Sequence, residues 1–280
     1  MTTAAPKPLG MGRVALTVND LTAVSDYYQK AIGLHLLASD GESHDLGVEG
    51  NTLLQLRKDK AARRASPREA GLFHTAFLLP DRAALGRWID HAINDRVAVT
   101  GASDHDVSEA IYLTDPEGNG IEIYADRPRD SWRWKNGLVE MATYQLDIEP
   151  ILKSAAGLPW TGFPAGSVVG HVHLQAGAIP PAEEFYSKLL GMDITSHYPG
   201  ATFYSAEGYH HHIATNIWNS RGAGPRDLPA TGLAELEINA PSAFVAGVET
   251  RLTTPAAHND RGLILSDPWG TPVVLVRNDI

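Results

Sequence analysis

Apolar residues along this chain form short runs separated by turns, and one such arrangement occurs twice. An apolar run from Val14 to Val18 precedes a segment whose apolar residues follow the spacing of a helix and which ends at Gly33. A second run, Val172 to Leu174, precedes a matching segment that ends at Gly191, 158 residues after Gly33. A glycine directly after a run of helical spacing is typical of a helix C-terminus. Both copies therefore predict a strand, a helix, a glycine stop and a further strand.

A second repeat lies near the end of each half. The sequence Asp115-Pro116-Glu117-Gly118 precedes an apolar strand, and so does Asp267-Pro268-Trp269-Gly270, 152 residues later. Proline presets the φ angle of a turn and glycine adopts positive φ, so both tetrapeptides predict a tight turn between two strands. Because the offsets of 158 and 152 residues are nearly equal, the two halves are related along their whole length.

Each half divides again into two modules. The segments from Leu72 to Leu79 and from Leu233 to Ile238 predict the first strands of a second and a fourth module. A helix is predicted after the first of these, with one apolar face made of Ala84, Leu85, Trp88, Ile89 and Ile93. We therefore expect an N-terminal domain over residues 10–125, a linker over residues 126–166 and a C-terminal domain over residues 167–280.

Composition limits the classes of function. The chain has 280 residues, 43% of them hydrophobic and 20% charged, which is typical of a globular protein. Its formal net charge of -10 argues against broad contact with nucleic acid, and the absence of cysteine excludes disulfides and thiolate metal ligands. No apolar stretch approaches the roughly 20 residues of a membrane helix, nor does the N-terminus contain the apolar run of a signal peptide. We expect a cytoplasmic protein without membrane or nucleic-acid partners.

Several motifs, taken in chain order, resemble those of a known family. They are Gly71-Leu72-Phe73-His74, Gly101-Ala102-Ser103-Asp104-His105 with Ser108-Glu109-Ala110-Ile111-Tyr112, Asp115 through Tyr124, and Gly170-His171-Val172-His173 with Tyr209-His210-His211-His212. With them the chain resembles the glyoxalase, bleomycin-resistance and extradiol-dioxygenase (vicinal-oxygen-chelate) superfamily, and within it the two-domain proteins called catechol 2,3-dioxygenase-like. The resemblance implies an α+β fold in which four βαβββ modules form two cup-shaped domains. It also implies a metal held from the first and last strands of the modules.

Two residues of the N-terminal half match the metal positions of this family. His74 lies on the first strand of the second module and Glu122 on its final strand, where alternation separates Glu122 from its apolar neighbours. The family's third position falls on Arg13, whose guanidinium has no lone pair to offer a metal. Gln55 occupies a position at which glyoxalase-like relatives have a ligand. The third ligand is left open between Arg13 and Gln55, and the alternative is a metal-free cup in which Arg13 pairs with Glu122.

The resemblance also implies an acid–base group in the N-terminal half. His105 would exchange protons with the substrate, Tyr112 would hydrogen-bond to it, and Asp104 would belong to the same group. The alternative is that Asp104 and His105 only shape a loop.

A second candidate metal site lies in the C-terminal half. The repeat places His171 at the position of Arg13, Glu235 at that of His74 and the non-coordinating Val274 at that of Glu122. If the run from His210 to His212 continues a strand, alternation sends His210 and His212 to one face. We therefore expect His171, His212 and Glu235 as a second set, with a purely structural role for these histidines as the alternative.

The resemblance implies a metal-dependent extradiol dioxygenase that cleaves a catechol-type ring with O2. Fe(II) is the expected metal and Mn(II) the alternative. One rival hypothesis is a metal-free protein that binds a small ligand. The other is a glyoxalase-like isomerase or lyase with Ni(II) or Zn(II) on Gln55, His74 and Glu122. A homodimer is expected, since closed two-fold symmetry is common among soluble proteins.

Overall fold

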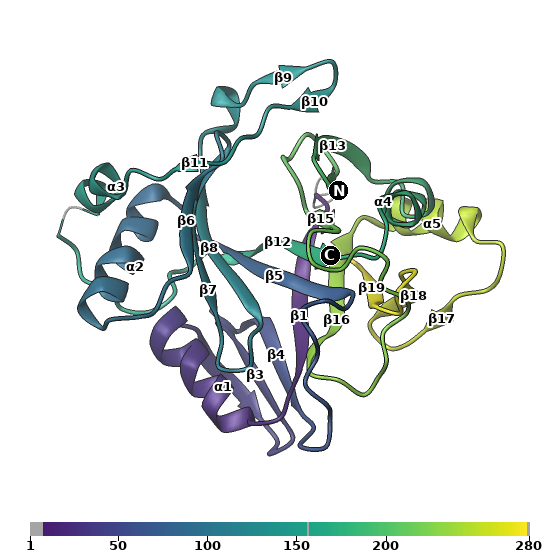
Figure 1. Cartoon of the computed structure of the whole chain (residues 1–280), viewed down its shortest axis with the longest axis horizontal. Coiled ribbons are helices and arrows are strands. Elements are labelled where there is room, and N and C mark those ends of the chain that lie inside the picture. Colours follow the sequence, from purple (N-terminus) through teal and green to yellow (C-terminus); the bar gives the residue numbers. More distant parts are fainter. Residues whose placement is uncertain (1–7, 156, 279–280) are drawn as a thin grey trace, which may run out of the picture.

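The computed structural model describes residues 8–155 and 157–278, and its elements fall into four modules (Figure 1). The first module consists of β1 (Gly10–Val18), α1 (Leu21–Tyr27), β2 (His35–Ser39), β3 (Ser43–Val48) and β4 (Asn51–Lys58). The second consists of β5 (Gly71–Leu78), α2 (Arg82–Asn94), β6 (Gly101–Asp104), β7 (Ser108–Thr114) and β8 (Gly120–Asp126). Each module is a strand, a helix and three further strands, so the predicted α+β repeat is confirmed.

The second half repeats this order. The third module consists of β12 (Val168–Gln175), α4 (Ile179–Glu183), β13 (Asp193–Tyr198), β14 (Ala201–Ser205) and β15 (Ile213–Asn216). The fourth consists of β16 (Gly232–Ala240), α5 (Ser242–Arg251), β17 (Ala257–His258), β18 (Gly262–Ser266) and β19 (Pro272–Arg277). In the first and third modules the helix continues into a π-helix, Tyr28–Ile32 and Glu184–Leu189. The predicted stops follow at positive φ, 100° for Gly33 and 81° for Gly191.

Short elements make up the linker between the halves. They are the 3-10 turn Arg129–Ser131, β9 (Trp134–Lys135), β10 (Leu138–Val139), β11 (Tyr144–Gln145) and α3 (Ile148–Ser154). β9 and β10 form a hairpin that projects at the top of Figure 1, while β11 pairs with β6. α3 packs on α2, where a Cβ on Gly86 would lie 2.3 Å from the carbonyl oxygen of Ile151. The linker therefore extends the second module before the chain enters β12.

The strands form two large sheets, and each sheet joins one module from each half. The order in the first is β17-β18-β19-β16-β1-β4-β3-β2, and in the second β11-β6-β7-β8-β5-β12-β15-β14-β13. We call them the 1–4 sheet and the 2–3 sheet after their modules. Within each sheet the two modules are joined by an antiparallel pair of first strands, β1 with β16 in the 1–4 sheet and β5 with β12 in the 2–3 sheet (Figure 1).

This pairing differs from the expectation that each half closes a cup of its own. The first strand of every module has a free edge, and any two such edges can pair in antiparallel fashion. The repeat identifies equivalent strands but not which edges meet. The ranges 10–125 and 167–280 thus delimit the related halves along the sequence, and their division into two domains stays a prediction.

A common apolar core connects the two sheets. Phe77 of β5 is fully buried and packs edge-on against Tyr28 of the first module, with ring centroids 6.3 Å apart. The indole N–H of Trp88 in α2 donates to the carbonyl oxygen of Ala31 across 3.2 Å. Asp81 caps α2 by accepting from the N–H of Ala84, and the predicted apolar face is buried except for Ile93, which is 59% exposed.

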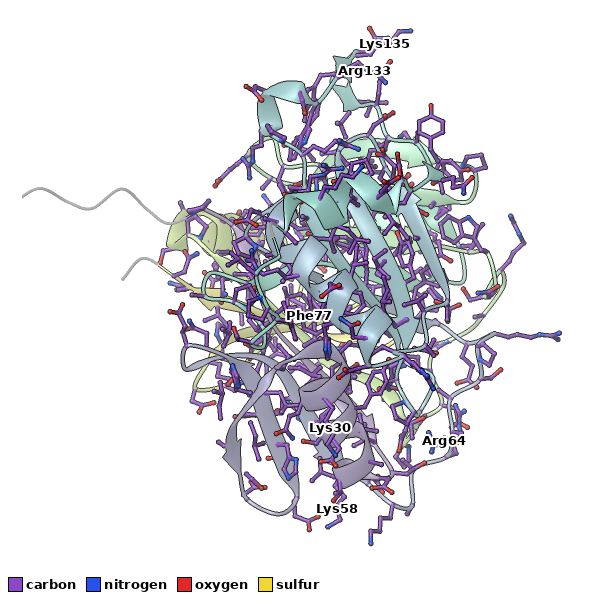
Figure 2. The ribbon with its side chains drawn as sticks, turned by 90° about the vertical axis from the view of Figure 1, so that its left-hand side faces the viewer. Lys30, Lys58, Arg64, Phe77, Arg133 and Lys135 are labelled. Atoms are coloured by element: carbon purple, nitrogen blue, oxygen red, sulfur yellow. The ribbon has the colours of Figure 1, made fainter. Side chains whose placement is uncertain are left out.

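Side chains alternate along the strands that carry the candidate site. In β8 Ile121 and Ile123 join the main core, while Glu122 faces the concave side. In β5 Phe77 belongs to the main core, whereas Ala76 belongs to a separate small cluster. Lysine and arginine side chains lie outside this core: Figure 2 shows Lys58, Arg133 and Lys135 at the edges of the molecule and Phe77 inside, and the Lys30 side chain is 77% exposed. None of the described helices is both long and apolar enough to cross a membrane.

Candidate active site

Three adjacent strands of the 2–3 sheet bring two histidines and a glutamate together. The Nε2 atom of His74 on β5 lies 3.0 Å from Oε2 of Glu122 on β8, and Nε2 of His171 on β12 lies 3.2 Å from the same oxygen. The two Nε2 atoms are 3.4 Å apart. All three residues are buried, with at most 5% of their surface exposed. His171 comes from the third module, so the set contains residues of both halves.

The spacing of these donor atoms suits a metal ion. Ligands about 2.1 Å from a metal with right angles between the bonds lie about 3 Å apart, which is close to the three separations here. Burial lowers the pKa of His171 to about 4. Burial alone would raise the pKa of Glu122, but the adjacent His171 and His74 outweigh it and hold that pKa well below its usual value. At neutral pH the site therefore offers a carboxylate and an imidazole lone pair, the forms that bind metals.

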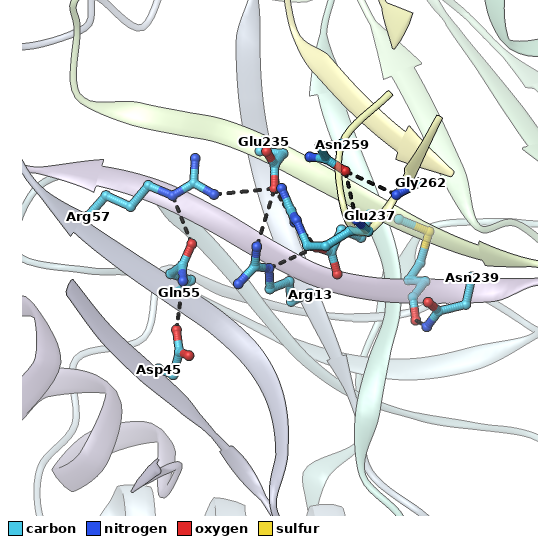
Figure 3. A network of polar contacts seen from close by, with 11 residues as sticks. Arg13, Asp45, Gln55, Arg57, Glu235, Glu237, Asn239, Asn259 and Gly262 are labelled. Carbon is cyan, nitrogen blue, oxygen red and sulfur yellow. Dashed lines mark hydrogen bonds and ion pairs between the residues drawn. The ribbon is translucent and has the colours of Figure 1, made fainter. Parts of the chain in front are cut away.

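The two residues considered for the third ligand lie elsewhere, in the 1–4 sheet. Arg13 does not pair with Glu122; its Nε lies 2.9 Å from Glu237 and its Nη2 3.6 Å from Glu235 (Figure 3). Gln55 donates from Nε2 to Asp45 across 2.9 Å. The Arg13–Glu122 ion pair, considered as the metal-free alternative, is therefore wrong. This ion pair does not form because the pairing of modules puts β1 and β8 in different sheets.

Glu235 belongs to an ion-pair cluster in the 1–4 sheet. By the repeat, this cluster occupies the place that His74 and His171 occupy in the 2–3 sheet. Oε1 of Glu235 lies 3.2 Å from Arg57 (Figure 3). The same oxygen lies 2.7 Å from Arg261, which also contacts Glu237. Burial tends to raise the pKa of Glu235, but the hydrogen bond from Arg261 and the charges of the arginines lower it. The structure does not bring Glu235 to His171, so the second expected metal set is not assembled.

The histidine run has a different geometry from the one expected. β15 begins at Ile213, so His210 to His212 precede the strand and do not alternate across it. His212 bonds through Nδ1 to the hydroxyl of Ser205 at 2.9 Å, and burial lowers its pKa to about 3. His211 instead lies against the ring of His171, with centroids 4.1 Å apart. His211 is thus a site residue that the sequence did not reveal, because the start of β15 was placed too early.

A cavity of about 290 Å³ opens beside the His74–Glu122–His171 set. Its wall includes Phe73, Ser103, His105, Val107, Ser108, Tyr112, Met141, Ala142, Thr143, His173, Ser196, Tyr198, Phe203, His211 and Trp218. His105 and Tyr112, expected as the acid–base group, both line it. The linker contributes residues 141–143, so it forms part of the wall as well as joining the halves.

His105 and Tyr112 form a hydrogen-bonded pair held by the linker. The Nδ1 atom of His105 lies 2.6 Å from the carbonyl oxygen of Ala142, and its Nε2 lies 2.7 Å from the hydroxyl of Tyr112. Since a carbonyl only accepts, Nδ1 carries a hydrogen and donates. Burial and the charge of Glu122 raise the pKa of Tyr112 well above its ordinary value, so the phenol keeps its proton.

Asp104 does not line the cavity. Its Oδ2 accepts from Arg127 across 2.6 Å and its Oδ1 from the backbone N–H of Asp106. Arg127 also contacts Glu109. This position fits the alternative in which Asp104 shapes the loop that carries His105.

Comparisons with known proteins agree with this geometry. Residues 10–123 match the family described as the Glyoxalase/Bleomycin resistance protein/Dioxygenase superfamily. The chain is 40% identical over 228 residues to a catechol-2,3-dioxygenase of Bacillus subtilis strain 168, covering 80% of each chain. It is 27% identical over 146 residues to biphenyl-2,3-diol 1,2-dioxygenase 3 of Rhodococcus globerulus, covering 45% of this chain and 70% of that one.

Solved structures show the same fold at lower identity. A protein of Bacillus subtilis subsp. subtilis strain 168 superposes with a TM-score of 0.65 at 13% identity, covering 98% of this chain and 86% of the other. Glyoxalase I of Zea mays superposes with a TM-score of 0.57 at 16% identity, covering 96% and 92%. The matched family over residues 10–123 and the 40% identity over most of the chain establish that this protein belongs to the glyoxalase/bleomycin resistance protein/dioxygenase superfamily.

Proposed function

We propose that this protein is a metal-dependent extradiol dioxygenase that acts on a catechol-type substrate. The observation that carries the proposal is the buried set of His74, His171 and Glu122 beside a cavity of about 290 Å³. The 40% identity to a protein named catechol-2,3-dioxygenase supports the same class of reaction. In that reaction the ring carbon–carbon bond beside the diol breaks, and both atoms of O2 enter the product.

Two histidines and one carboxylate on one side of a metal leave coordination positions free, as in non-haem Fe(II) oxygenases. In the proposal His74, His171 and Glu122 hold Fe(II), with Mn(II) as the alternative. The ion would supply the positions at which the two diol oxygens and O2 are held close together. Burial of the three ligands keeps bulk water from competing for them.

The other cavity residues would handle the substrate's protons. His211 contacts His210 through Nδ1, so its Nε2 is the nitrogen free to accept a proton from a diol hydroxyl. Tyr112 lies near Glu122 and keeps its phenolic proton, which suits it to hydrogen-bond a substrate oxygen. His105 would hold Tyr112 in place and exchange a proton through it. Asp104 would act indirectly, by shaping the loop before His105.

The rival hypotheses lose their structural support at this site. The glyoxalase-like ligand set needs Gln55, which hydrogen-bonds to Asp45 and Arg57 in the 1–4 sheet. The metal-free hypothesis rested on Arg13 facing Glu122, and Arg13 pairs with Glu235 and Glu237 instead.

Metal content after anaerobic loading with Fe(II) tests the proposal. We expect about one iron per wild-type chain, and its loss in His74→Ala, His171→Ala and Glu122→Gln, since all three residues would bind one ion. Glu235→Gln is the matched control and should keep its iron. The loaded wild type should consume one O2 per catechol in an oxygen-electrode assay. Full iron occupancy in the three ligand variants, or equal O2 uptake by metal-free protein, would refute the proposal.

A homodimer and a cytoplasmic location are further parts of the proposal that rest on sequence alone. Sedimentation of the purified protein tests the first, and fractionation of the source cells tests the second.

A further inference from the structure

The candidate cavity has two chemically different regions. Its buried region contains the ring nitrogens of His74 and His171 and the carboxylate of Glu122. Its outer region is aromatic: Phe73, Tyr198, Phe203 and Trp218 all line it. A diol bound at the first region would direct the rest of its ring system toward the second.

The aromatic side chains form a connected wall. The ring of Trp218 lies 5.4 Å from Phe73 and 5.4 Å from His173, measured between centroids. Phe203 lies 5.0 Å from His211. Trp218 is held in position by its indole N–H, which donates to the carbonyl oxygen of Pro199 across 2.9 Å. These contacts hold the wall through the protein's own groups, which reduces the entropy lost when a ligand binds.

The wall reaches the surface at two exposed aromatic residues. Trp218 is 44% and Tyr198 50% exposed, although both line the cavity and their rings lie 6.4 Å apart. Large aromatic side chains that remain partly exposed at a cavity mouth gain from covering by an apolar ligand. Trp218 and Tyr198 therefore offer a surface for a substituent that extends beyond the diol ring.

No cation accompanies this aromatic wall. Neither lysine nor arginine occurs among the described residues that line the cavity, and its charged group is the acidic Glu122. Arg133 and Lys135, at the top of Figure 2 in the projecting hairpin, are not among the residues that line the cavity. A carboxylate on the substrate would lose its hydration here without gaining an ion pair, which is strongly unfavourable.

We propose that the site selects diols that carry an uncharged apolar substituent, preferably an aryl group seated against Trp218 and Tyr198, and rejects carboxylated diols. The inference rests on the proposed function for the position of the diol. It adds the class of substituent, which the three metal-binding side chains do not determine.

Binding tests the proposal separately from turnover. Iron-loaded protein is titrated under anaerobic conditions with 4-phenylcatechol, catechol, methyl 3,4-dihydroxybenzoate and 3,4-dihydroxybenzoate. The ester and the acid differ in charge at the same ring position, and we expect the ester to bind at least roughly 10-fold more tightly. We expect 4-phenylcatechol to bind roughly 10- to 100-fold more tightly than catechol.

Two tryptophans provide a matched pair of variants. Trp218→Ala should abolish most of the preference for 4-phenylcatechol over catechol, whereas Trp218→Phe should retain it. Trp134, 43% exposed on β9 and absent from the cavity wall, is the control, and Trp134→Ala should bind all four compounds as the wild type does.

The outcomes separate this inference from the proposed function. Equal affinity for the acid and its ester, or a phenyl preference that survives Trp218→Ala, overturns the inference even if catechol is cleaved. Tight binding of 4-phenylcatechol that depends on Trp218, without ring opening when O2 is admitted, supports the inference and counts against the dioxygenase reaction.

Discussion

His210 and His211, neighbours in the chain, face each other through their Nδ1 atoms at 2.7 Å. The other ring nitrogen of His210, Nε2, lies 2.9 Å from Oδ1 of Asp126. A carboxylate accepts the hydrogen on Nε2, and with its hydrogen there the imidazole of His210 offers Nδ1 as an acceptor. His211 then donates from Nδ1, and its Nε2 presents a lone pair to the cavity. Asp126 is therefore positioned to fix the tautomer of a histidine that it does not touch.

Replacing Asp126 tests this arrangement. In Asp126→Asn the amide can donate to Nε2 of His210, which would invert both tautomers and leave a hydrogen on Nε2 of His211. We expect kcat/KM for catechol to fall by roughly 10- to 1,000-fold and its pH profile to shift, with iron content unchanged. Asp45→Asn, in the 1–4 sheet, is the control and should match the wild type. A normal pH profile in Asp126→Asn would mean that Asp126 is only structural.

The ion-pair cluster around Arg13 should stabilise the fold without affecting the proposed metal site. Arg13→Leu removes a partner from Glu235 and Glu237, whose side chains are 12% and 11% exposed, but Arg261 still contacts both carboxylates. We expect the free energy of unfolding in urea to fall by about 1–3 kcal/mol. Arg57 is 37% exposed and has one ion pair, so Arg57→Leu should cost less than about 1 kcal/mol.

The variant Arg13→His tests whether a histidine at the position equivalent to His171 is enough to create a metal site in the 1–4 sheet. Arg13 corresponds to His171 in the repeat, yet Val274 stands in the 1–4 sheet where Glu122 stands in the 2–3 sheet. We expect Arg13→His to bind no additional iron. A second equivalent of iron per chain in elemental analysis would contradict this reading of the cluster.

Acid should destabilise the metal-free protein because of buried neutral histidines. Burial lowers the pKa of His212 from 6.5 to about 3, so the unfolded chain binds a proton below pH 6.5 that the folded chain does not bind until about pH 3. Stability therefore falls as pH falls across this window, by about 1.4 kcal/mol per pH unit for such a group. Urea unfolding at pH 7.5 and pH 5 should reveal a loss of about 2 kcal/mol from His212 alone. Between pH 7.5 and pH 5 the variant His212→Gln should lose about 2 kcal/mol less unfolding free energy than the wild type. An equal loss in both proteins would show that His212 does not contribute.

Local features of the fold could be predicted from the sequence, whereas the pairing of modules could not. Gly33 and Gly191 end their helical segments, and Asp115 and Asp267 each accept two backbone N–H groups in the predicted turns. These features depend on residues within a few positions of one another. Pairing of β5 with β12 depends on which free edges meet across a linker of about 40 residues, and no pattern within either strand specifies that.

The same distinction applies to the candidate site. His74, Glu122, His105 and Tyr112 lie together because they belong to a single module. His171 was assigned to a separate site because its contact with Glu122 crosses from one half to the other. His211 was not selected because its orientation depends on where β15 begins.

Because modules of the two halves pair in one sheet, the residues of the candidate site are synthesised at different times. His74 and Glu122 leave the ribosome before His171, which follows Glu122 by 49 residues. At about 5–20 residues per second that interval lasts roughly 2–10 s. During it the nascent chain holds two of the three donors, so a metal captured early would be held only weakly. In the proposed site, complete coordination would wait until β12 has been made and has docked on β5, which would couple metal uptake to the joining of the two halves.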